Sequence, residues 1–218
     1  PYWHPVAVRV EVGGVCALTG ARNAGGLAAD PQNYMVAGEQ PWLDGIKAEE
    51  GLIRQFVAAP LGERVTIEAQ VTGAEHVGGI QLTVVEPKDG RFPETPPPGL
   101  RGWSGALADF AASSISDLTV HEGPVAMGLG AGGRMVQKIY PDPHGIDTWD
   151  LGLAVTVQIH LVDARDWFAI TGEEPPTSPI SVETYKSLGL PWFALADYDL
   201  GDLPVSPTLG GVKPVPFG

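Results

Sequence analysis

The sequence is nearly free of cysteine, and it lacks any long apolar run. Cys16 is the only thiol in 218 residues, so no disulfide can close within the chain. Its apolar surroundings are the usual setting of a small buried thiol. No stretch of about 20 apolar residues is present, so the sequence gives no sign of a membrane span. No signal peptide is visible either. Because the chain begins at Pro1 rather than Met, earlier removal of a leader stays open, and with it the localisation.

Basic residues are also scarce. The chain has 13 Lys and Arg against 26 Asp and Glu, a formal net charge of −13. Such a balance opposes nonspecific binding to nucleic acid and to anionic membranes, so nucleic acid is not an expected partner. Neither a nucleophile elbow nor an HExxH motif occurs. The five histidines have no metal-ligand spacing; they stand at positions 4, 76, 121, 144 and 160.

Glycine and proline are abundant, at 29 and 21 residues, which predicts many turns and little long helix. Several short segments alternate apolar and polar residues with a period of two, as β-strands do. We therefore expect a mainly β protein with short helices, a β-rich α+β fold. Its two related strand-turn-helix units would pack as a sandwich-like or pseudo-twofold body.

The two related units are residues 6–42 and 155–192. Each has an alternating apolar run, an Ala-(Leu/Ile)-Thr-Gly turn, a proline-started segment with a tyrosine, a glycine and a Pro-Trp pair, in the same order. This order predicts an internal duplication. The alternating strand residues are Val6, Val8, Val10 and Val12 in the first unit, and Val155, Val157, Ile159 and Leu161 in the second.

After the strand, each unit carries the signals of a helix of about two turns. Asp30 before Pro31, and Ser178 before Pro179, are typical cap and first-turn pairs. A glycine then closes each segment. Because so short a helix is unstable alone, we expect aromatic side chains to fold it onto its own strand; these are Tyr34, Trp42, Tyr185 and Trp192.

The rest of the chain divides at a proline-rich stretch. Residues 1–86 form the first β-rich half, with a strand or buried segment over 51–60 and a hairpin over 65–85. Residues 87–102 are a loop or linker. Residues 103–218 form the second half and end in an extended tail. The GLGAGG run at 128–133 lacks the strand-to-helix context of a phosphate-binding loop, which favours either a wide hairpin or a close backbone approach.

The sequence contains candidate residues for an ion-binding site and for a hydrolytic site. Asp197, Asp199 and Asp202 alternate beside a glycine like part of a calcium loop, although Thr208 stands where an EF-hand needs a glutamate. Asp142, Asp147 and Asp150 form a second acidic group, for which solvated turn residues are the commoner explanation. For hydrolysis, the candidates are His160 and His144, each with a nearby carboxylate.

The stretches QPWLDG (40–45), IRQFVA (53–58), GLGAGGRM (128–135) and LPWF (190–193) resemble stretches of an uncharacterised family of bacterial proteins. The resemblance covers most of the chain. It implies no activity, cofactor or site.

Without a clear catalytic group, the sequence favours a non-catalytic binding or self-assembling structural protein that uses its β-rich surfaces and strand edges. A protein partner or a homo-oligomer is then expected, with no cofactor. Two alternatives stay open: a hydrolase using His160 or His144, and an acidic calcium-binding module at Asp197, Asp199 and Asp202.

Overall fold

The computed structural model describes residues 4–22, 25–40, 42–93, 95, 127–175, 183 and 200–216. The fold is mainly β with short helices, as expected from the sequence, and its strands form two antiparallel sheets. The strands are β1 (Val6–Val12), β2 (Val15–Cys16), β3 (Met35–Ala37), β4 (Gly45–Glu49), β5 (Leu52–Pro60), β6 (Ile80–Val85), β7 (Met127–Val136) and β8 (Val155–Ile159). The α-helices are α1 (Ile67–Thr72), α3 (Ala164–Thr171) and α5 (Pro207–Gly210), and two 3-10 helices span Ile146–Thr148 and Leu151–Leu153.

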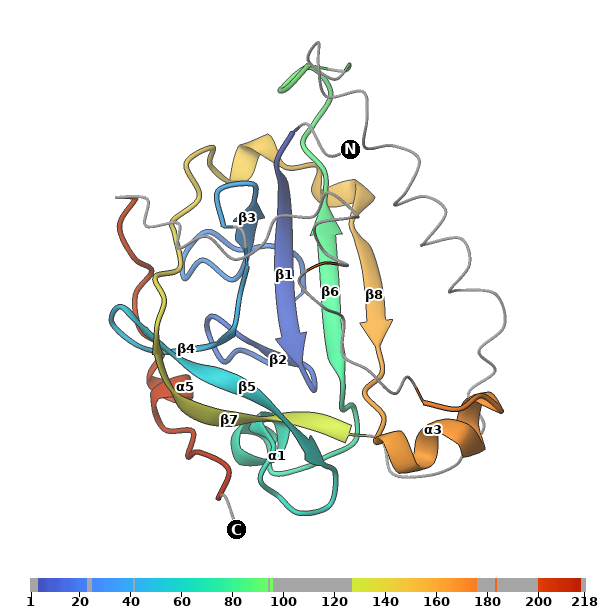
Figure 1. Ribbon diagram of the computed structural model, residues 1–218. Helices are drawn as coiled ribbons and strands as arrows, with labels where there is room; N and C mark the ends of the chain where they lie inside the picture. The colour runs from blue at the N-terminus through green and yellow to red at the C-terminus, as the bar shows by residue number, and fades with distance from the viewer. Residues whose placement is uncertain are drawn as a thin grey trace.

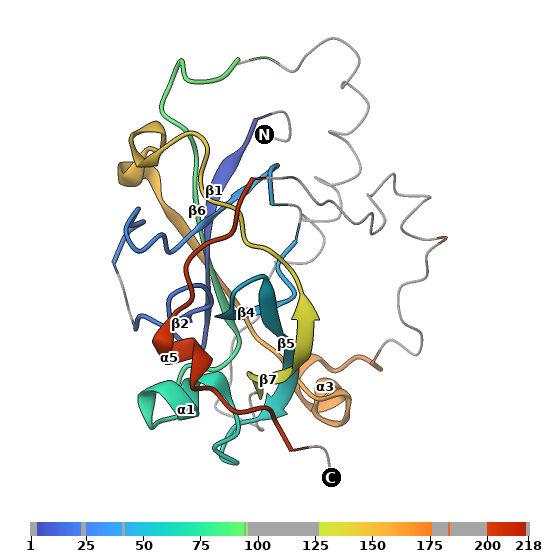
Figure 2. The same ribbon diagram turned by 90° about the vertical axis from the view of Figure 1, so that its left-hand side faces the viewer.

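The larger sheet has the order β2-β1-β6-β8, with β3 also paired to β1. The smaller sheet has the order β4-β5-β7 and crosses over the larger one (Figures 1 and 2). The main core lies between them. It joins the valines of β1 to Ile46 of β4, Leu129 of β7, Ile67 of α1 and Leu209 of α5. Two sheets thus face each other across this core, but the strands of the two related units, β1 and β8, both belong to the larger sheet, so the units do not pack on each other as a sandwich.

The strands β1 and β8 both pair antiparallel with β6, one on each side. They therefore run in the same direction within one sheet, and their apolar residues share one face. A twofold axis would reverse either the direction or the face, so none relates these two strands. Their surroundings also differ: β1 is almost wholly buried, whereas every residue of β8 is exposed.

Two expected elements are wrong. Residues 31–38 do not form a helix; Met35–Ala37 is strand β3, paired with β1. The alternation of buried Tyr34 and Val36 outweighs the cap signal there. Residues 67–72 form helix α1 rather than the first strand of a hairpin. The Thr66 hydroxyl accepts a hydrogen bond from Ala69 N, and Gly73 ends the helix with φ of 81°.

Two strands lie where the sequence predicted them, whereas the end of the chain differs from the prediction. The segment 51–60 contains strand β5, and Val155–Ile159 is strand β8. The described residues of 87–102 contain no helix or strand. The expected extended tail is instead packed, because Leu203, Leu209 and Val212 are buried. Residues 103–126 lie outside the described residues, and so do Tyr185 and Trp192 of the second related unit.

Candidate functional site

Every residue of β8, the outer strand of the larger sheet, is exposed. This strand pairs with β6 through five residue pairs, from Ile80↔Ile159 to Val84↔Val155. No described strand pairs with its other side. A strand edge of this kind presents a row of backbone N–H and C=O groups ready to pair with another strand.

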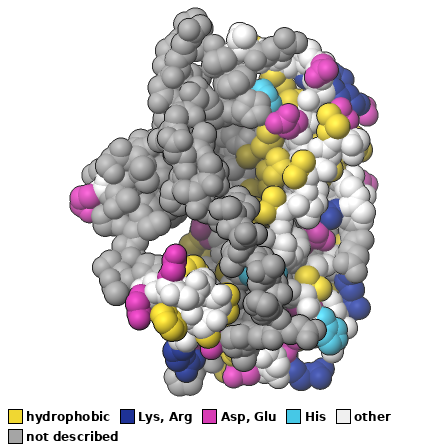
Figure 3. All heavy atoms as spheres, turned by 90° about the vertical axis from the view of Figure 1, so that its right-hand side faces the viewer, with side chains coloured by type: hydrophobic (Ala, Val, Ile, Leu, Met, Phe, Trp, Pro, Cys, Tyr) yellow, Lys and Arg dark blue, Asp and Glu magenta, His cyan; other side chains and the backbone are white. Residues whose placement is uncertain are grey.

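One face of β8 is apolar and open to solvent. Relative exposure is 61% for Val155, 49% for Val157 and 38% for Ile159. These side chains continue rows that begin in the core: Val8 and Val84 lead to Val155, and Val10 and Leu82 lead to Val157. The smaller sheet covers the β1 end of these rows. Figure 3 views the molecule from the β8 side and shows hydrophobic side chains gathered on this face.

The opposite face of β8 is polar, and its side chains bond to β6. The Thr156 and Thr83 hydroxyls lie 3.0 Å apart, and Gln81 Nε2 donates to Gln158 Oε1 at 2.8 Å. These cross-strand pairs fix the register of β8. The exposed apolar residues are therefore held in one orientation.

The chain around β8 is also without charge. Residues 151–160, LGLAVTVQIH, contain no Asp, Glu, Lys or Arg, in a protein of net charge −13. Edge strands are commonly protected from pairing by a charged side chain, a proline or a bulge. None of these occurs in Val155–Ile159. We term the outer edge and apolar face of Val155–Ile159 the β8 edge.

His144, one of the two histidines singled out from the sequence, has a carboxylate partner. Its Nε2 lies 2.9 Å from Glu39 Oε1, and both side chains are about one-quarter exposed. The His144 ring meets Phe92 and Trp149 edge-on, with centroids 5.3 and 6.0 Å apart. Within the described chain no serine, threonine or cysteine side chain bonds to the imidazole. The described residues thus place a carboxylate beside the imidazole and no nucleophilic side chain against it.

Asp142 ties the loop that carries His144 to the larger sheet. Its Oδ2 accepts hydrogen bonds from Tyr34 Oη at 2.6 Å and Trp149 Nε1 at 2.8 Å, while Oδ1 accepts from His144 N at 2.7 Å. Burial, with the hydrogen bond to Asp142 and its negative charge, raises the pKa of Tyr34 well above its ordinary value. These contacts engage Asp142 in the fold.

His160 lies just after β8 and is exposed, with no hydrogen bond to any residue in the described ranges. The contacts of His144 are different, since its ring meets Glu39, Phe92 and Trp149. The structure thus gives a carboxylate partner to one of the two candidate histidines.

Both carboxylate oxygens of Asp202 bond to other residues of the protein. Its Oδ2 pairs with Lys47 Nζ and accepts from Gly51 N at 2.6 Å, and its Oδ1 accepts from Ile139 N at 2.9 Å. Asp197 and Asp199 lie outside the described residues. Among the residues that are described, no group of three or more His, Cys, Asp or Glu could hold a metal ion.

The glycine run belongs to strand β7, where it permits close packing. A methyl group on Gly132 would lie 2.6 Å from Val57 Cγ2 of β5, and one on Gly130 would clash with Val215. The expected close backbone approach is therefore present. A phosphate-binding loop would lead directly into a helix, whereas here strand β7 continues to Val136.

Alternation in the sequence predicted β8 as a strand, but it did not show that this strand is an exposed edge. The absence of charge over residues 151–160 was the sequence feature that could have indicated an exposed, unprotected edge. Glu39 and His144 are 105 positions apart, and no sequence pattern indicated that they pair.

No family model, curated protein or solved structure matches this chain. No helix in the described part is long and apolar enough to cross a bilayer.

Proposed function

We propose that this chain is a non-catalytic, self-assembling structural protein, and that two copies join through their β8 edges. The observation that supports this most strongly is the exposed, uncharged apolar face of Val155–Ile159 at a sheet edge with which no described strand pairs. Joining two such edges would extend the larger sheet across both copies and bring their exposed apolar side chains into lateral contact, which removes part of the surface of these side chains from water.

The sequence of β8 is complementary to itself. In an antiparallel pair centred on Val157, Val155 meets Ile159 of the second copy, and Thr156 meets Gln158. Apolar side chains then face apolar ones on one side, and polar side chains face polar ones on the other. A twofold axis perpendicular to the sheet produces this arrangement and keeps the two apolar faces continuous.

The charge distribution favours a second copy at this place. Two chains of net charge −13 repel each other over most of their surfaces. The stretch 151–160 carries no charge, so two copies can approach there with the least repulsion. A partner of another sequence would need its own apolar strand.

Sedimentation velocity on the wild type, on Val157→Lys and on Val136→Lys tests the proposal. Val136 is a matched control because it is also a strand valine, 79% exposed, on β7 of the other sheet. We expect the wild type and Val136→Lys to sediment as dimers of the 22.9 kDa chain, and Val157→Lys as a monomer. A wild type that stays monomeric at all concentrations would contradict self-assembly.

The His144–Glu39 pair supports a second candidate function, a hydrolase in which His144 acts as a base toward water. Hydrolysis of p-nitrophenyl acetate by the wild type and by His144→Gln tests it. Loss of turnover in the variant, with unchanged thermal stability, would support catalysis. Equal rates would remove this candidate.

A further inference from the structure

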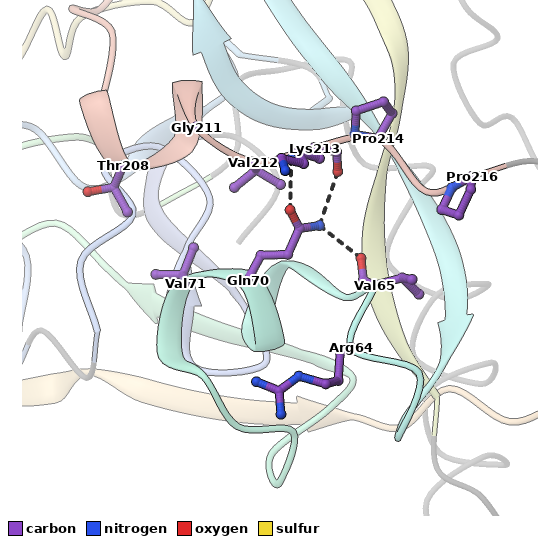
Figure 4. Close-up of a pocket in the computed structure, with 10 residues that line it drawn as sticks. All are labelled: Arg64, Val65, Gln70, Val71, Thr208, Gly211, Val212, Lys213, Pro214 and Pro216. Carbon is purple, nitrogen blue, oxygen red and sulfur yellow. Dashed lines mark hydrogen bonds between the residues drawn. The ribbon is translucent and has the colours of Figure 1, made fainter.

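A groove lies on the described surface between α1, α5 and the C-terminal segment 212–216. Its volume is about 720 Å³, within the range of sites that hold small molecules. Apolar side chains from Val65, Val71 and Val212 form part of its wall, and Arg64, Gln70 and Lys213 contribute polar groups. Figure 4 shows these residues around the opening.

Hydrogen bonds hold the walls in place. Gln70 Nε2 donates to the carbonyl oxygens of Val65 and Lys213, at 3.0 Å each, and Gln70 Oε1 accepts from Lys213 N at 2.8 Å (Figure 4). Farther along, Val215 N donates to Ala131 O of β7 at 2.7 Å. The C-terminal segment is thus fastened both to α1 and to the smaller sheet, so the groove is preformed.

The groove is cationic in an acidic protein. Arg64 and Lys213 line it, no carboxylate is among its described lining residues, and the guanidinium of nearby Arg22 bonds to the Val71 carbonyl. In the described part of the chain, neither Arg64 nor Lys213 has an ion-pair partner. These two cations are therefore available to a ligand.

Two carboxylates of this region, Glu68 and Glu75, have hydrogen-bond partners other than these two side-chain cations. Glu68 accepts backbone N–H groups from residues 76–78, at 2.8 to 2.9 Å. Glu75 accepts from Gly62 N at 2.7 Å, from Arg64 N at 3.1 Å and from the Thr66 hydroxyl at 2.6 Å. Glu75 thereby fixes the backbone of the residue whose guanidinium lines the groove.

We propose that this groove binds a small organic anion, whose carboxylate or phosphate head group pairs with Arg64 and Lys213. A short apolar body would lie against the valines of the wall. A neutral molecule would forgo the charge-assisted hydrogen bonds, which are about twice as strong as neutral ones. This site shares no residue with the β8 edge, so either proposal can fail without the other.

Titration of the ¹⁵N-labelled wild type with hexanoate, hexyl phosphate and hexanol, followed by NMR, tests the proposal. Both anions should give saturable shifts at the amides of Val65, Val71 and Val212, with hexanol at least tenfold weaker. The tighter anion identifies the head group. Binding of hexanol as tight as that of the anions, or no saturable shift with either anion, would overturn the proposal.

A charge-removing double variant, Arg64→Asn with Lys213→Gln, gives the second arm. Asn tolerates the left-handed backbone that Arg64 adopts, with φ of 59°, so the loop conformation is retained. We expect the affinity for the preferred anion to fall about tenfold or more. Lys88→Gln removes an exposed cation elsewhere and should leave the affinity unchanged. Equal affinity in the double variant would contradict the assignment.

Discussion

Lys47 is a fully buried cation on β4, and its partner is Asp202, which lies before helix α5 in the chain. The same carboxylate accepts two backbone N–H groups, from Gly51 and Ile139. Burying two charges costs desolvation energy that the pair only recovers when its geometry and remaining hydrogen bonds are satisfied. Asp202 has these additional hydrogen bonds, so the ion pair ties the backbone at residue 202 to the smaller sheet.

Replacing Asp202 by alanine would leave the Lys47 ammonium buried and unpaired. We expect a loss of about 3 to 5 kcal/mol in the free energy of unfolding, measured by urea denaturation. Adding Lys47→Met should restore part of that loss, because the uncompensated charge is gone. If the double variant is no more stable than Asp202→Ala alone, the buried charge is not what stabilises this region.

Tyr34 illustrates how a residue identified from a repeat acquires a different role. It was expected to anchor a short helix, whereas it is 1% exposed beside strand β3 and donates to Asp142. Its raised pKa in the folded state means that the native protein holds this proton more tightly than the unfolded chain does. Its contribution to stability is complete below the unfolded pKa of about 10 and declines as the pH rises above that value.

Spectrophotometric titration of the phenolate band checks the state of Tyr34. The chain has five tyrosines, and Tyr34 should remain protonated while the fold persists. Between about pH 9 and pH 11, the wild type and Tyr34→Phe should therefore gain the same absorbance. A gain smaller by one tyrosine in the variant would show that Tyr34 ionises normally.

At the scale of elements, alternation in the sequence correctly located β1, β6 and β8, because a period-two pattern is typical of a strand. The apolar segment 51–60, with no clear period, left a strand and a buried segment open, and it contains β5. Alternation could not tell the buried β1 from the exposed β8, since both alternate in the same way. What differs is the covering sheet, which comes from residues 45–60 and 127–136. Burial is thus set by distant partners that a local pattern does not contain.

Errors arose where two local signals competed. Over 65–69 the alternation suggested a strand, but the Thr66 cap and Gly73 define helix α1. Over 31–38 the reverse occurred, and pairing with β1 formed strand β3 despite a cap signal at Asp30. In both places, the backbone hydrogen bonds that form depend on the nearby groups: the Thr66 side chain at the start of α1, and strand β1 beside β3. The candidate sites were harder still, because Glu39 and His144 meet only through the fold.

The glycines of β7 allow a test at the level of the smaller sheet. Gly132→Ala would place a methyl group 2.6 Å from Val57 Cγ2, against a stiff β-branched side chain. We expect a cost of about 1 to 3 kcal/mol, seen as a lower melting temperature. The adjacent Gly133 provides the control, since its added methyl would be 3.8 Å from Gln55 Oε1. Equal melting temperatures for both variants would contradict the close packing.

For the whole molecule, the proposed dimer sets an apolar contact against a long-range repulsion. The contact at Val155–Ile159 is uncharged, whereas each chain carries a net charge of −13. Salt screens the repulsion and leaves the apolar contact intact, so the dimer should tighten as salt rises from about 50 to 500 mM. Analytical ultracentrifugation can measure this dissociation constant. A dimer that weakens with salt would indicate an ionic interface instead.

Disulfide trapping measures the proposed strand pairing most directly. In an antiparallel pair centred on Val157, the two copies of this residue face each other with Cα atoms about 4.5 to 5.5 Å apart, within reach of a disulfide. Cys16 is buried and cannot compete. Under mild oxidation, Val157→Cys should form covalent dimers, while Val155→Cys, which faces Ile159 of the second copy, should not. Failure of Val157→Cys to cross-link, or equal cross-linking at both positions, would contradict the β8 edge as the site of assembly.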